Sequence, residues 1–234
     1  MTGLEEMPFL KEKGHIISLV GGGGKTTLLY AMARCCAAQG RRVLVTTTTH
    51  IQCPAVCYVP DEAARDALWA TGHYAVAGTP AEHGKLTIPP SRQLADWMAQ
   101  ADTVFIEADG AKHHPCKAPA AHEPVILPEC DIVLAVAGLS ALGKPLKEVC
   151  FRLAETCDLL NASPNDCLTM EFLAKLLSSE RGGRKSVGMR RFCVVLNQAD
   201  DPDLRRTGEK IREILAEKYH IESFLTHFME GERA

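Results

Sequence analysis

The residue run with the most evident chemistry is a block of glycines followed by one lysine and two threonines. It consists of Gly21, Gly22, Gly23, Gly24, Lys25, Thr26 and Thr27. Glycines let backbone N–H groups turn toward phosphate oxygens, a helix that starts there adds its positive end, and the lysine can reach terminal phosphates. The hydroxyl directly after such a lysine can bind Mg²⁺. The run therefore predicts a phosphate-binding loop; a glycine turn that only connects a strand to a helix is the alternative.

Two carboxylates follow an apolar strand pattern at 103–107. Glu107 and Asp109 are separated by Ala108, so both lie on one face of the strand if it continues that far. Ligands of open parallel sheets bind at the carboxyl ends of the strands. One carboxylate is expected to hold Mg²⁺ together with Thr26, directly or through water, while the other orients a water or a substrate. An acidic strand end that faces solvent is the alternative.

A polar, histidine-rich stretch comes next. Its candidate catalytic residues are Lys112, Lys117, His122 and Glu123. The other candidate catalytic residues of the chain are Lys25, Glu107 and Asp109. The two lysines of the stretch could bind an anion or a transferred phosphoryl group, and His122 with Glu123 could carry out acid–base chemistry. Soft metal ligands also occur here, at His113, His114 and Cys116, but no second cluster stands at a defined spacing. A polar loop without chemistry is the alternative.

Asn197 and Asp200 close a late apolar strand. Asn-Lys-x-Asp in this position is the guanine-reading sequence of GTPases, and this chain has Gln198 in place of the lysine. Guanine recognition by Asn197 and Asp200 is therefore one interpretation. An adenine nucleotide, or a strand-capping turn without base contact, is the other. The expected nucleotide is ATP or GTP, with Mg²⁺.

The elements that must position these residues follow from apolar periodicity. The patterns predict strands at 15–20, 42–47, 103–107, 132–137 and 192–196, and helices at 26–39 and 204–218. Near-continuous apolar strands that alternate with helices predict a three-layer α/β fold of the P-loop NTPase type, with a mainly parallel sheet. Residues 1–234 are expected to form one domain, in which 53–100 is a possible small insertion or lid. The run 181–185 predicts a mobile surface loop.

Composition limits the class of protein. The chain has 234 residues, 46% of them hydrophobic, and a formal net charge of -3, so nothing draws it generally to nucleic acid or anionic membranes. It has neither an apolar run long enough to span a bilayer nor the features of a signal peptide at its start. Ten cysteines without a C-x-x-C pair predict reduced thiols that pack mostly as small hydrophobic residues. A role for one or two of them as soft metal ligands or in handling sulfur or selenium is the alternative. We expect a cytoplasmic protein.

Several segments taken together resemble the YqeC family of P-loop proteins. They are LVGGGGKTTLL, VTTTTHI, FIEADGAK, KAPAAHEPVILP, GLSALGKPL and LNQAD. The resemblance implies an accessory role in the maturation of a selenium-dependent molybdenum hydroxylase, with that enzyme or its cofactor-maturation proteins as partners. The short glycine loop is also similar to that of Mur-type ligases. A small-molecule ligase or kinase, and a non-catalytic nucleotide-gated metallochaperone, therefore remain as alternatives, and intrinsic NTP hydrolysis stays open.

Overall fold

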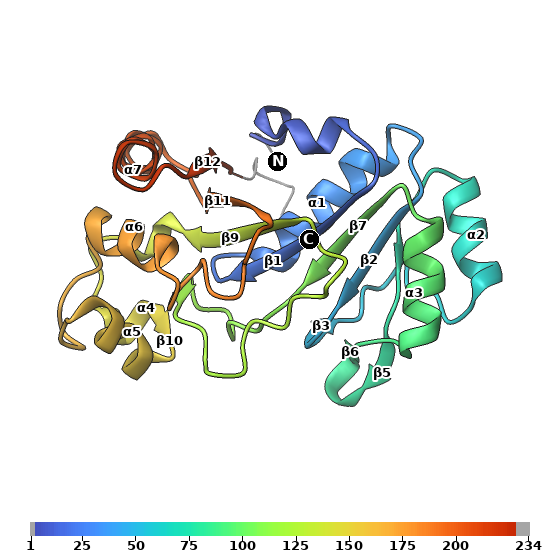
Figure 1. Ribbon diagram of the computed structural model, residues 1–234, viewed down its shortest axis with the longest axis horizontal. Helices are drawn as coiled ribbons and strands as arrows, with labels where there is room; N and C mark the ends of the chain where they lie inside the picture. The colour runs from blue at the N-terminus through green and yellow to red at the C-terminus, as the bar shows by residue number, and fades with distance from the viewer. Residues whose placement is uncertain (1–2, 228–234) are drawn as a thin grey trace.

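The computed structural model describes residues 3–227 and is built on a central sheet of seven parallel strands (Figure 1). In spatial order the strands are β12 (Glu222–Leu225), β11 (Arg191–Asn197), β9 (Ile132–Gly138), β1 (His15–Gly21), β7 (Thr103–Glu107), β2 (Val43–Thr47) and β4 (Ala75–Val76). Each neighbouring pair is parallel. The carboxyl ends of the strands therefore all meet at one edge of the sheet, where ligands bind in folds of this kind.

Side chains on both faces of the sheet are buried. In β9, Ile132 and Leu134 pack on the face covered by α1 (Lys25–Ala37), whereas Val133 and Ala135 pack on the opposite face. That opposite face is covered in two parts. One part is covered by α2 (Glu62–Ala70) and α3 (Ser91–Gln100), and the other by α4 (Leu146–Val149), α5 (Leu153–Leu160), α6 (Met170–Ser178) and α7 (Pro202–Tyr219). The prediction of a three-layer α/β fold with a mainly parallel sheet is confirmed.

The first residues of the described chain complete the layer of α1. Two short 3₁₀ helices, η1 (Leu4–Glu6) and η2 (Pro8–Lys11), bury Phe9 and Leu10 in the same core as α1. The strands expected at 15–20, 42–47, 103–107, 132–137 and 192–196 are present, with bounds that differ by one residue or less. No helix in residues 3–227 combines the length and the apolar character needed to cross a membrane.

The segment 53–100, expected as a small insertion or lid, divides between two parts of the fold. Helices α2 and α3 pack on the main sheet, and β4 is its edge strand. A separate antiparallel sheet is formed by β3 (His50–Gln52), β6 (Lys85–Thr87) and β5 (Thr79–Ala81), with the turn η3 (Glu82–Gly84) between the last two. Of the segment 53–100, β5 and β6 thus belong to a small sheet apart from the central one.

Short elements fill the chain between β7 and β11. After β7, the chain forms β8 (Cys116–Lys117), which pairs in parallel with β10 (Cys150–Phe151), while η4 (Leu139–Ala141) follows β9. The run 181–185 was expected as a mobile surface loop. It forms a turn that is exposed or partly exposed except at Gly182, where the expectation of a surface position was wrong. Gly182 is buried, and a Cβ there would lie 1.9 Å from the Leu176 carbonyl oxygen. Lys185 Nζ from the same turn donates to the carbonyl of Ala120 at 2.5 Å.

Candidate functional site

The glycine run connects β1 directly to α1 at the carboxyl edge of the sheet. Helix α1 begins at Lys25, and its N-cap Gly24 has a φ of 91°. Within residues 3–227 no side chain caps this helix end, and its first turn contains no acidic residue. Helix N-termini normally receive a side-chain acceptor or a negative charge, because their first N–H groups lack partners in the helix. This end of α1 is therefore suited to an external anion.

The loop is wedged between two other segments. The Gly22 N–H donates to the Val136 carbonyl at 2.9 Å, and the Gly23 N–H donates to the His114 carbonyl at 3.0 Å. Gly23 has a φ of 70°, and a Cβ there would lie 2.0 Å from the backbone nitrogen of Gly138. Glycine is thus required by both conformation and space. These contacts fix the loop against the end of β9 and the chain that follows β7.

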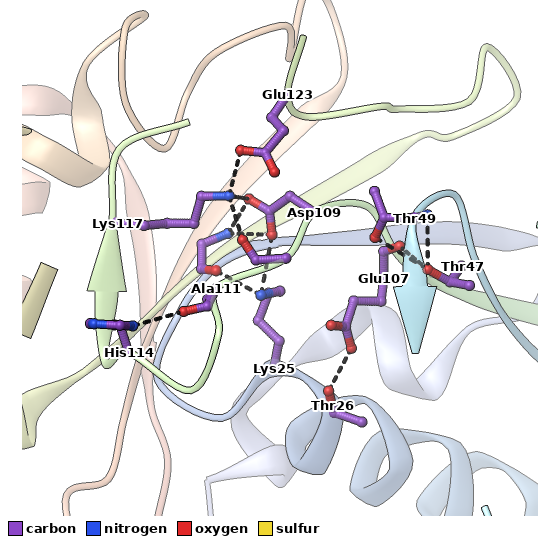
Figure 2. A network of polar contacts seen from close by, with 12 residues as sticks. Lys25, Thr26, Thr47, Thr49, Glu107, Asp109, Ala111, His114, Lys117 and Glu123 are labelled. Carbon is purple, nitrogen blue, oxygen red and sulfur yellow. Dashed lines mark hydrogen bonds and ion pairs between the residues drawn. The ribbon is translucent and has the colours of Figure 1, made fainter. Parts of the chain in front are cut away.

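Lys25 and Asp109 form a buried ion pair beneath the loop (Figure 2). Lys25 Nζ lies 3.2 Å from the Asp109 carboxylate and donates to the Gly21 carbonyl at 2.6 Å, and Lys25 is only 4% exposed. The Gly21 N–H donates to both oxygens of Asp109 at 3.0 and 3.1 Å. Asp109 therefore orients the lysine and the start of the loop, although the sequence also allowed it to bind the metal.

Lys117 extends this pair into a chain of alternating charges. Its Nζ lies 3.2 Å from Asp109 and donates to Glu123 Oε2 at 2.8 Å, and the same oxygen accepts from Arg152 Nε at 3.0 Å. Burial alone would raise the pKa of Glu123, but the hydrogen bonds from Lys117 and Arg152 outweigh it and lower the pKa to about 2. Glu123 is thus held as a carboxylate that positions two cations.

Thr26 and Glu107 form a second polar pair on the other side of Lys25 (Figure 2). The Thr26 hydroxyl donates to Glu107 Oε2 at 2.6 Å. Burial raises the pKa of Glu107, although Lys25 and the Thr26 hydroxyl act in the opposite direction. The backbone of Glu107 is held by Thr47, whose hydroxyl donates to its carbonyl at 2.9 Å. The pair places a hydroxyl and a carboxylate oxygen together beside the start of α1.

These two oxygens fit a magnesium ion that arrives with phosphate. Mg²⁺ in nucleotide sites takes one or two protein oxygens and completes its shell with phosphates and waters. Within residues 3–227 no group of three or more His, Cys, Asp and Glu residues is arranged to hold a metal by itself. The soft-metal set of His113, His114 and Cys116, which the sequence suggested, forms no such group in these residues.

Comparison with known protein families matches residues 17–154 to the model of the YqeC protein family. The chain belongs to the YqeC family. The match includes the glycine loop, the acidic residues Glu107 and Asp109 and the Lys117–Glu123 pair, so the whole charge network lies within the matched region. An uncharacterized protein YqeC of Escherichia coli (strain K12) is 34% identical over 99 residues. These residues are 41% of this chain and 39% of that protein, so the match spans about two fifths of the curated relative.

The remaining predicted residues of this YqeC family member lie in different surroundings. Lys112 and His122 are exposed, and Thr27 is partly exposed on the first turn of α1. Asn197 is fully buried; its Nδ2 donates to the Gly23 carbonyl at 2.8 Å, and its Oδ1 accepts from Thr226 at 2.9 Å. Asn197 thus ties the glycine loop to β11 and the chain after β12, and the exposed Asp200 lies three residues beyond it.

The sequence did not predict two residues of the site. Phe151 and Arg152 come from β10 and the start of α5, and the parallel pairing of β10 with β8 sets them beside Lys117. Three cations surround the Phe151 ring: Lys112 Nζ at 5.5 Å, Lys117 Nζ at 5.7 Å and the Arg152 guanidinium carbon at 5.0 Å from its centroid. A two-residue strand has no periodic signal, so only the folded chain reveals this cluster.

Proposed function

We propose that the chain binds a nucleoside triphosphate with Mg²⁺ at the glycine loop and the first turn of α1. One observation carries this proposal: Lys25 stands at a helix end that no described side chain caps, beside the oxygen pair of Thr26 and Glu107. Phosphate oxygens would accept from the first N–H groups of α1 and from Lys25. Mg²⁺ would neutralise phosphate charge next to Thr26 and Glu107.

Binding would require a local rearrangement. The Gly23 N–H donates to the His114 carbonyl, so it must release this partner before it can bind phosphate. Lys25 donates to the Gly21 carbonyl with one of its three N–H groups and can turn another toward phosphate. The segment that carries His114 also leads to Lys117. A nucleotide would therefore alter the position of the chain that follows β7, which suits a protein whose nucleotide state changes its contacts with a partner.

The physiological role that we propose follows from the family resemblance. It is a cytoplasmic accessory role in the maturation of a selenium-dependent molybdenum hydroxylase, with that enzyme or its cofactor-maturation proteins as partners. Deletion of this protein should lower the selenium content of the client enzyme while its molybdenum content is measured in parallel. Normal selenium loading in the deletion strain would reject this role and leave nucleotide binding as a separate question.

Calorimetric titration of the purified protein with ATP and with GTP, each with and without Mg²⁺, tests the binding proposal. We expect Mg²⁺-dependent binding that Lys25→Ala weakens by at least about tenfold, since a charge-assisted contact is worth roughly 1.5–3 kcal/mol. Lys210→Ala, at an exposed lysine of α7, is the matched control and should bind as the wild type does. Equal affinities in all three proteins would remove the glycine loop as the nucleotide site.

A small-molecule ligase or kinase is a second candidate, and the cations around Phe151 favour it. Close to the glycine loop, three charged groups lie within 6 Å of the Phe151 ring centroid: those of Lys112, Lys117 and Arg152. Such a cluster could bind an anionic acceptor for the terminal phosphoryl group. A ligase or kinase should release phosphate or ADP only when its acceptor is present. A nucleotide-gated binding protein should hydrolyse slowly whatever small molecule is added.

A further inference from the structure

Two cysteines face each other beside the glycine loop and are not among the groups that the proposed nucleotide site uses. Cys116 of β8 and Cys150 of β10 occupy paired positions of two parallel strands. Their Sγ atoms are 3.0 Å apart, and the residues are 1% and 4% exposed. Sulfur atoms at this separation need little movement to form a bond of about 2.05 Å. The other cysteines are scattered through the cores and over the surface, and Cys167 is exposed.

We propose that Cys116 and Cys150 form a reversible disulfide, a modification site that responds to hydrogen peroxide. Peroxide is the oxidant of choice here because it is small and both sulfurs are buried. The Cys150 thiolate attacks one peroxide oxygen, the O–O bond breaks, and hydroxide leaves and is protonated to water. The Cys116 sulfur then attacks the sulfenic sulfur of Cys150, its proton goes to the departing hydroxide, and a second water leaves. Two electrons pass from the thiols to peroxide, and a dithiol reductant reverses the reaction.

The surroundings make the two sulfurs unequal. The hydrogen bond between the thiols lowers the pKa of Cys150, against the effect of burial, and Thr156 acts in the same direction. The same hydrogen bond and burial raise the pKa of Cys116. Of the two sulfurs, Cys150 loses its proton more readily, so the proposal places it first in the reaction, and Cys116 completes the bond.

The disulfide would restrain the charge network next to it. Lys117 directly follows Cys116, and Phe151 with Arg152 directly follows Cys150. The glycine loop also touches this strand, because a Cβ on Gly22 would lie 3.1 Å from the Cys116 Cα. Oxidation would hold β8 to β10 and oppose the movement of His114 that phosphate binding requires. This consequence, unlike the disulfide itself, rests on the proposed nucleotide function.

Peptide mapping of the full-length protein tests the disulfide. The reduced protein is treated with one equivalent of hydrogen peroxide, its free thiols are alkylated under denaturing conditions, and linked peptides are measured by mass spectrometry. We expect the Cys116–Cys150 peptide pair to form first and to disappear with dithiothreitol. Cys167, the exposed thiol, should stay free. If the exposed Cys167 were modified before any Cys116–Cys150 link formed, the proposal would be overturned. It would also be overturned if Cys116 in the Cys150→Ser variant formed a disulfide with another cysteine in the same yield.

Nucleotide titration tests the coupling separately. Oxidised wild-type protein should bind Mg²⁺-nucleotide at least about fivefold more weakly than the reduced protein, the lower range of measured coupling between sites. A Cys116→Ser/Cys150→Ser variant should not respond to peroxide, and Cys167→Ser should respond as the wild type does. Equal affinities in both redox states would overturn the coupling. Absence of binding in both states would reject the nucleotide proposal, while the peptide map would still decide the disulfide.

Discussion

At the residue scale, the short hydrogen bond between Thr26 and Glu107 predicts that the Thr26 hydroxyl contributes to magnesium binding. The Thr26 hydroxyl donates to Glu107 at 2.6 Å and can turn one lone pair to a metal while it does so. Thr26→Val keeps the shape of the side chain and removes the hydroxyl. We expect the Mg²⁺-dependent gain in nucleotide affinity to fall by roughly tenfold, the equivalent of about 1.4 kcal/mol, while metal-free binding stays. Titrations with and without Mg²⁺ measure this difference.

The neighbouring threonine supplies the control for that variant. Thr27 is also partly exposed on the first turn of α1, but its hydroxyl makes no contact with Glu107 in the described hydrogen bonds. Thr27→Val should therefore keep the Mg²⁺ dependence of the wild type. Full Mg²⁺ dependence in Thr26→Val would show that the ion, if bound, is held without this hydroxyl, and Glu107 would then remain as its protein ligand.

At the scale of elements, the connection from β1 to α1 depends on the absence of a side chain at Gly23. Gly23→Ala places a Cβ 2.0 Å from the Gly138 nitrogen at a φ of 70°. Gly72→Ala, after α2, has a similar φ of 74° but meets nothing within 4 Å of its Cβ among the described atoms. Both variants lose about 1–2 kcal/mol of the free energy of unfolding, because alanine is strained in the left-handed backbone conformation at these positions. We expect Gly23→Ala to lose roughly 2 kcal/mol more of the free energy of unfolding, because β9 must move. Urea unfolding compares them; equal losses would mean that the loop shifts freely.

The burial and the length of the elements explain why some of them could be predicted from the sequence and others could not. Strands β1, β2, β7, β9 and β11 are buried on both faces, so each is a continuous apolar run that the sequence displays. Helices α2 and α3 were missed, although Asp61 caps α2 by accepting from the Ala64 N–H. That cap was a usable signal in the sequence. Strands β8 and β10 have two residues each, and only tertiary packing defines them.

The site likewise has features that the sequence predicted and features that depend on tertiary packing. Lys25, Glu107 and Asp109 stand beside predicted strands, so their convergence at one edge could be expected. Their division of roles could not, because it depends on which partner each carboxylate reaches: Thr26 for Glu107, and two lysines for Asp109. The Asn197 motif left guanine recognition, an adenine nucleotide and a strand-capping turn open, and its amide contacts the loop backbone and Thr226.

At the scale of the whole molecule, one charge network joins both halves of the described chain. It alternates in sign from α1 to the start of α5 through Lys25, Asp109, Lys117, Glu123 and Arg152. Buried charges are costly unless each has a partner, so removal of one member leaves its neighbours unpaired. The network therefore contributes to stability as well as to the site, and Glu123 makes that contribution measurable.

Acidification should reveal the contribution of Glu123. Its pKa is about 2 in the folded chain against an ordinary value of 4.5, so between these values the unfolded chain binds a proton that the folded chain does not. The free energy of unfolding therefore falls as the pH falls from about 5 toward 2, by at most about 3 kcal/mol from this group. Glu123→Gln should be less stable than the wild type at pH 6 and lose less on acidification. Urea unfolding between pH 6 and 3 measures both slopes, with the exposed Glu129→Gln as a control that follows the wild type. Parallel slopes for wild type and Glu123→Gln would show that Lys117 and Arg152 do not hold Glu123 ionised, and the network would then end at Lys117.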